Sequence, residues 1–178
     1  LGIIMGMPIT LLPTQLLLVN LVTDGLPAIA LGVEPAEREN MKQPPRRSDE
    51  SFFSDGLMTK IIFRGILIGL CTLGCFALFT YMFGDLTIAR TGALFTLIMS
   101  QLAHVFECKS EKKNIFTVPY FSNPKLILAV LVSAAVIFAA MYVPFLQIIF
   151  TTAPLTLKQL LIAFGFAMFA PLLQCVLK

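Results

Sequence analysis

The stretch that decides the fold runs from residue 12 to residue 31 and reads LPTQLLLVNLVTDGLPAIAL. It is long and apolar enough to cross the hydrocarbon core of a bilayer, which takes about 20 residues of α-helix. Its middle nevertheless carries Asn20, Thr23 and Asp24. A carboxylate at that depth costs roughly 2.5–3.5 kcal/mol on insertion scales, so a partner or a bound cation must compensate for it. The stretch therefore predicts a membrane helix that contains a polar site.

The three polar residues stand at positions i, i+3 and i+4, so on an α-helix their side chains project from one face. Together they offer amide, hydroxyl and carboxylate oxygens, which suit hard cations. Calcium takes about six to eight oxygen ligands, so other segments would have to supply the rest. No Cys or Met site accompanies Asp24, which disfavours copper or zinc transport.

The backbone beside the cluster is also unusual, because Gly25 and Pro27 follow Asp24. Proline has no N–H to donate to the carbonyl four residues earlier, so the Thr23 carbonyl becomes a further candidate ligand. A break in a helix at mid-membrane is tolerated only where protein buries it or where it lines a cavity. We therefore expect the first helix to be broken near Asp24-Gly25-Pro27.

The composition extends this conclusion to the whole chain. Of its 178 residues, 57% are hydrophobic and 13% are charged, against about 25% charged in ordinary soluble domains. A water-soluble fold is therefore excluded. We predict an all-α, polytopic membrane bundle of five transmembrane helices, at about residues 11–32, 57–83, 88–107, 124–143 and 155–176.

The basic residues indicate the orientation, because Lys and Arg accumulate in short cytoplasmic loops. Of the thirteen, only Arg90 and Lys158 fall at the opposite ends of the predicted helices. The others gather in the first and third connections, at the adjoining helix ends and at Lys178. The first helix should thus run from outside to inside, and the C-terminus should be cytoplasmic.

The run from Leu12 to Ala28 closely resembles the sixth membrane helix of calcium-transporting type II P-type ATPases. The segments at 32–35 (GVEP) and 41–46 (MKQPPR) resemble the next cytoplasmic loop of that family. The resemblance implies that residues 1–10 are the end of a preceding helix and an outer loop, and that residues 11–178 are the C-terminal transmembrane transport domain.

The resemblance also implies roles for particular residues. Asn20 and Asp24 would ligate calcium through side-chain oxygens, and Thr23 would belong to a second site. Gln101 falls where the sarcoplasmic-reticulum type has a glutamate ligand, which favours one ion per cycle. His104 lies one turn beyond Gln101 on the same face, and interhelical hydrogen bonding is favoured for it over a role as ligand or proton carrier.

The function implied is the ion-binding segment of an ATP-driven calcium export pump in a bacterial cell membrane. The phosphorylation motif and the nucleotide-binding domain do not occur in these residues, so ATP and Mg²⁺ would bind to other parts of the same polypeptide. The chain alone would then not be catalytic. Its partners would be the lipid bilayer and the N-terminal helices and cytoplasmic domains of that polypeptide, and no nucleic acid is expected.

Two other classes of protein remain open. A cation channel or secondary carrier would use the same polar cluster without ATP. A non-transporting assembly subunit would use Asn20 and Thr23 as interhelical hydrogen-bonding groups and would pair Asp24 with a basic residue. Substitution of Asn20 or Asp24 distinguishes an assembly subunit from a transporter. In an assembly subunit the substitution would impair folding without changing any ion affinity.

Overall fold

The computed structural model describes residues 2–4, 6–33, 57–108 and 123–176. Within these ranges the chain is helical and contains no strand, which confirms the predicted all-α class. Four of the described helical segments are long and apolar enough to cross a membrane: Pro13–Gly32, Met58–Phe83, Leu86–Phe106 and Pro124–Tyr142. A shorter apolar helix, Leu157–Leu173, follows them.

The first span consists of three consecutive elements: α1 (Pro13–Asn20), the π-helical η1 (Leu21–Gly25) and α2 (Leu26–Gly32). The later elements are α3 (Leu57–Phe83), α4 (Leu86–Cys108), α5 (Pro124–Tyr142), α6 (Pro144–Phe150) and α7 (Leu157–Val176). Helix α6 lies between the predicted helices at about 124–143 and 155–176, where no helix was predicted. Pro144 explains it, because proline at the first helical position is preorganised to begin a helix.

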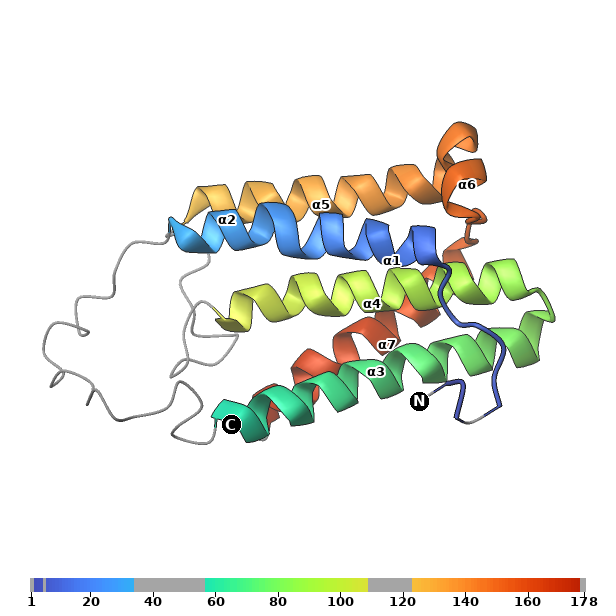
Figure 1. The fold of residues 1–178 in the computed structure, drawn as a ribbon, viewed down its shortest axis with the longest axis horizontal. Coiled ribbons are helices and arrows are strands. Elements are labelled where there is room, and N and C mark those ends of the chain that lie inside the picture. Colours follow the sequence, from blue (N-terminus) through green and yellow to red (C-terminus); the bar gives the residue numbers. More distant parts are fainter. Residues whose placement is uncertain (1, 5, 34–56, 109–122, 177–178) are drawn as a thin grey trace, which may run out of the picture.

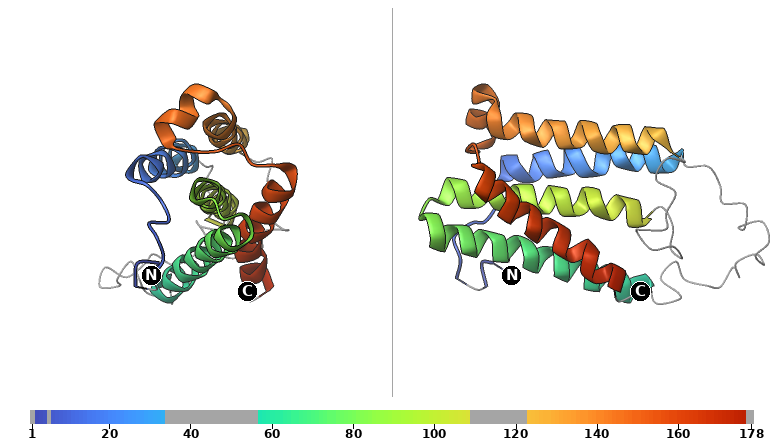
Figure 2. Two further views of the ribbon diagram at one scale, coloured as in Figure 1. Left: turned by 90° about the vertical axis from the view of Figure 1, so that its right-hand side faces the viewer. Right: turned by 180° about the vertical axis from the view of Figure 1, so that it is seen from behind.

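Helix α4 lies in the middle of the bundle (Figures 1 and 2). The broken span α1–η1–α2 and helix α5 run side by side on one flank of α4, and α3 and α7 lie on the other. One buried apolar cluster joins the flanks, with contributions from Leu18, Val22, Phe76, Phe95 and Ile137. The broken span is therefore fixed to the rest of the bundle through α4 and α5.

Helices α3 and α4 approach closely at Gly92. A Cβ atom at this position would lie 2.6 Å from two ring carbons of Phe79, which is itself fully buried. Lipid provides no hydrophobic driving force between helices, so membrane helices associate largely through van der Waals packing. Small residues at the interface strengthen this packing because they let the backbones approach closely. Gly92 therefore sets the spacing of this helix pair.

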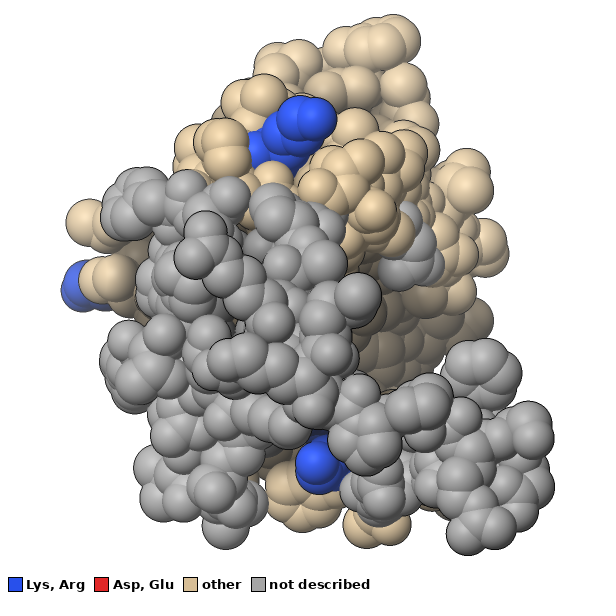
Figure 3. Space-filling view, turned by 90° about the vertical axis from the view of Figure 1, so that its left-hand side faces the viewer, with Lys and Arg blue, Asp and Glu red and all other residues tan. Residues whose placement is uncertain are grey.

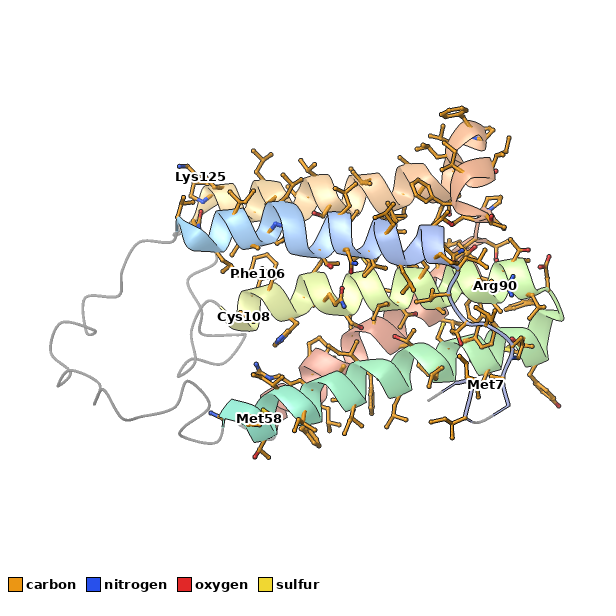
Figure 4. All side chains as sticks on the ribbon, viewed as in Figure 1. Met7, Met58, Arg90, Phe106, Cys108 and Lys125 are labelled. Carbon is orange, nitrogen blue, oxygen red and sulfur yellow. The ribbon has the colours of Figure 1, made fainter. Side chains whose placement is uncertain are left out.

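The two ends of the bundle differ in charge and in contacts. Lys125 and Cys108 lie at one end and Arg90 and Met7 at the other (Figure 4). Seen toward the first of these ends, the described surface carries Lys and Arg but no Asp or Glu (Figure 3). At the other end, the Arg90 Nε donates to the Ile9 carbonyl at 2.9 Å and ties the N-terminal segment to α4.

Candidate ion site

The predicted break in the first helix takes the form of a π-turn. Residues Leu21–Gly25 form η1, and α2 begins directly after it with Pro27 in its first turn. Gly25 has φ −73° and ψ −84°, outside the usual α-helical range of ψ. Single π-turns inside helices are rare and occur frequently at functional sites.

A carbonyl inside the π-turn has a side-chain donor on a neighbouring helix. The hydroxyl of Ser133 on α5 donates to the Val22 carbonyl at 2.8 Å in a buried position. Pro27, which follows in the first turn of α2, has no N–H to donate to the turn before it.

Ser133 was not among the residues that the sequence analysis singled out. It is fully buried on α5, where most neighbours along the helix are apolar. The sequence does contain a sign of its role, because an isolated serine in an apolar membrane helix commonly donates a hydrogen bond to another helix. Its partner could not be inferred, since that depends on how α5 packs against η1.

The three residues of the predicted cluster have different surroundings. Asn20 ends α1 and is exposed on the described bundle. Thr23 is buried within η1, and its hydroxyl donates to the Val19 carbonyl at 2.8 Å. The backbone of Asp24 belongs to η1, while its side chain lies outside the described part of the structure. The wider turn that begins after Asn20 offers a reason why Asn20 and Thr23 differ in exposure.

The two secondary candidates lie on α4. The side chain of Gln101 is half-buried, and its Oε1 is the only buried side-chain oxygen or nitrogen in the described ranges without a hydrogen-bond partner. An unpaired buried oxygen costs about 1–3 kcal/mol and calls for a cation, a water or a further donor. His104 Nε2 lies 3.4 Å from the Cys108 Sγ, one turn further along the same helix.

Two further buried amide side chains hold the ends of the broken span. Asn123, the N-cap of α5, donates from Nδ2 to the Ala30 carbonyl of α2 at 3.0 Å. Gln15 near the start of α1 donates from Nε2 to the carbonyls of Phe150 and Thr151 at 3.1 and 3.3 Å. The span is thus hydrogen-bonded to neighbouring segments at three places: near its start through its own Gln15 side chain, and at its break and near its end through the side chains of Ser133 and Asn123.

In the described ranges, no group of three or more His, Cys, Asp or Glu residues could hold a metal ion. A cavity of about 530 Å³ lies between α3 and α7, and its lining is apolar, including Leu67, Cys71, Phe166 and Phe169. None of the five candidate residues lines it. The arrangement around η1 can thus supply part of an oxygen-based cation site, but not all of it.

The chain is similar to known proteins over nearly its whole length. Residues 8–178 match the family described as "Cation transporting ATPase, C-terminus". The chain is 40% identical over 165 residues to a calcium-transporting ATPase of Bacillus subtilis (strain 168), with 92% of this chain and 18% of the relative covered. It is 34% identical to calcium-transporting ATPase 1 of Bacillus cereus, with 100% and 21% covered.

A plant protein is also similar. The calcium-transporting ATPase 4 of endoplasmic reticulum type from Arabidopsis thaliana is 30% identical, with 98% of this chain and 22% of the relative covered. The chain therefore spans only about a fifth of the length of the curated relatives it matches.

Proposed function

Because the chain belongs to the family of cation-transporting ATPase C-terminal regions, we propose that it is the ion-binding membrane segment of an ATP-driven calcium export pump. The transported ion is the substrate, and Asn20, Thr23 and Asp24 contribute ligands to it. ATP and Mg²⁺ act in other domains of the same polypeptide. The two relatives from Bacillus carry calcium transport in their names, which supports calcium as the ion.

The observation that carries the proposal is the π-turn at Leu21–Gly25. It contains Thr23 and Asp24 and begins directly after Asn20. Discontinuous helices are a recurring way to build ion sites in membrane transporters, because the irregular backbone lines a cavity. An uncompensated carboxylate at this depth would be costly, and a bound cation removes that cost.

Further segments of the polypeptide are needed to complete the coordination. Calcium takes about six to eight oxygens, more than the three residues provide. Asn20 is exposed on the described bundle, as are Leu17 and Leu21 beside it, so this face can receive further helices. Gln101 is a candidate for an additional amide ligand, since its buried Oε1 has no partner in the described structure.

The orientation belongs to the same proposal. The end of the bundle that carries Lys125 faces the cytoplasm, and the end that carries Arg90 faces outward. The C-terminus is then cytoplasmic, and the bilayer that holds the chain is the bacterial cell membrane.

The test is Asp24→Asn in the full-length pump. The substitution keeps the size of the side chain and removes its charge, so calcium-dependent phosphorylation by ATP should be lost. The measurement is phosphoenzyme formed from radiolabelled ATP across a calcium titration. Normal phosphoenzyme with a normal calcium midpoint would refute the assignment.

Asp85→Asn is the matched control. Asp85 is exposed in the turn between α3 and α4 and accepts a hydrogen bond from the Thr87 N–H at 2.7 Å. At the N-cap of a helix, asparagine accepts such a hydrogen bond about as well as aspartate. The control should therefore keep its phosphoenzyme level and calcium midpoint, which separates loss of an ion ligand from loss of any acidic residue.

A further inference from the structure

We infer that α5 acts as a splint for the broken helix, with Ser133 and Asn123 as positioning residues that fix the segments on either side of the break. This inference rests on the proposed function, because the element they hold is the one that carries the ion ligands. Neither residue contacts the ion in this scheme. Each acts by holding a backbone carbonyl in place.

The first contact is on the N-terminal side of the break. The Val22 carbonyl lies in the π-turn and accepts from the Ser133 hydroxyl at 2.8 Å. Ser133 is fully buried and Val22 is nearly so, so water does not reach this bond as an alternative partner. Loss of the hydroxyl would remove this buried interhelical bond and its hold on the π-turn.

The second contact is on the C-terminal side. The Asn123 side chain donates to the Ala30 carbonyl at 3.0 Å, and its Oδ1 accepts from the Leu126 N–H at 3.1 Å. One amide group therefore begins α5 and holds the last turn of α2 at the same time. The position of α2 is in this way linked to the first residue of α5.

The geometry of the two contacts makes α5 a splint rather than a single anchor. At 1.5 Å per residue, Val22 and Ala30 are about 12 Å apart along the helix axis, and Asn123 and Ser133 are about 15 Å apart. The residue numbers pair in opposite order, so the helices are antiparallel. Asp24, Gly25 and Pro27 all lie between the two fixed carbonyls, so α5 constrains both ends of the irregular segment.

The experiment measures calcium-dependent phosphorylation by ATP in the full-length pump that carries Ser133→Ala or Asn123→Ser. Serine at 123 keeps a good N-cap but is too short to reach Ala30. Each variant should raise the half-saturating calcium concentration by about three- to tenfold, which corresponds to the loss of one buried hydrogen bond. Ser133→Thr keeps the hydroxyl and should restore the midpoint toward that of the wild type.

Ser100→Ala is the matched control. Ser100 on α4 is also fully buried and also donates to a backbone carbonyl of a neighbouring helix, that of Ala167 at 2.9 Å, but it does not contact the broken span. This variant should leave the calcium midpoint unchanged.

The outcomes separate the two proposals. A wild-type pump without calcium-dependent phosphorylation would refute the proposed function itself. A functional wild type combined with unchanged midpoints in Ser133→Ala and Asn123→Ser would overturn the splint. So would an equal shift in Ser100→Ala, or a lower phosphoenzyme maximum at an unchanged midpoint, because these results indicate a general structural role.

Discussion

Two prolines in this bundle each remove a backbone hydrogen-bond donor from a helix, but the helix is irregular beside only one of them. Pro27 in the first span and Pro171 in α7 both lack the N–H that a helix needs. In each case a serine of a neighbouring helix donates to a carbonyl of the preceding turn: Ser133 to Val22, five residues before Pro27, and Ser100 to Ala167, four residues before Pro171. Helix α7 nevertheless stays α-helical through Pro171, whereas the first span changes to a π-turn.

The difference teaches that proline alone does not make an irregular site. In α7 the freed carbonyl is the one four residues before the proline, as in a regular α-helix. In the first span the carbonyl that accepts from the neighbouring serine is the one five residues before the proline. Gly25 lies two residues before Pro27 and adopts a ψ of −84°, whereas the residue two before Pro171 is Phe169. We attribute the π-turn to the combination of glycine, proline and a hydroxyl placed to donate to the Val22 carbonyl.

The substitution Pro27→Ala gives the strongest test of the difference between the two prolines. The new N–H can pair with a carbonyl of the preceding turn, and alanine is about 3 kcal/mol more favourable than proline inside a helix. We expect a higher thermal midpoint of the purified full-length pump, together with a calcium affinity at least about tenfold weaker, because the helix becomes regular. Thermal unfolding and the phosphorylation titration measure the two effects.

Pro171→Ala is the counterpart of that variant. It should change the thermal midpoint in the same direction but leave the calcium affinity as in the wild type. An equal loss of calcium affinity in both variants would contradict the view that only the first proline shapes the ion site.

Gly25→Ala should have a smaller effect of the same kind. Alanine is about 0.5–1 kcal/mol more favourable than glycine in a helix, so it biases the segment toward the regular form. No described atom lies within 4 Å of a Cβ built at this position, so a steric effect from these residues is not expected. We expect the half-saturating calcium concentration to rise about two- to fivefold. An unchanged value would show that glycine is not required for the π-turn.

The smallest expected effect concerns the coupling between Ser100 and Pro171. If Ser100 stabilises a carbonyl that Pro171 has freed, then Ser100→Ala should cost less stability when residue 171 is alanine and the helix supplies its own donor. A double-mutant cycle on thermal stability should give a coupling energy of about 0.5–1 kcal/mol. Additive effects would mean that the Ser100 bond is independent of the proline.

The sequence by itself determined the all-helical membrane fold and the place of the break. Both follow from local rules: apolar segments must be long enough for the bilayer, and a proline cannot donate a hydrogen bond wherever the rest of the chain lies. The polar cluster of Asn20, Thr23 and Asp24 was visible for the same reason, since a carboxylate is conspicuous in an apolar run. These features need no knowledge of neighbours.

Only the tertiary structure decided how the break is stabilised. The sequence pointed to the Thr23 carbonyl as a candidate ligand, and it gave no sign that the packing of α5 brings the Ser133 hydroxyl to the Val22 carbonyl. The burial of Thr23, the exposure of Asn20 and the contact between Asn123 and Ala30 likewise depend on which helices lie beside the broken span. A hydrogen bond between helices joins residues about a hundred positions apart, and no local pattern encodes that distance.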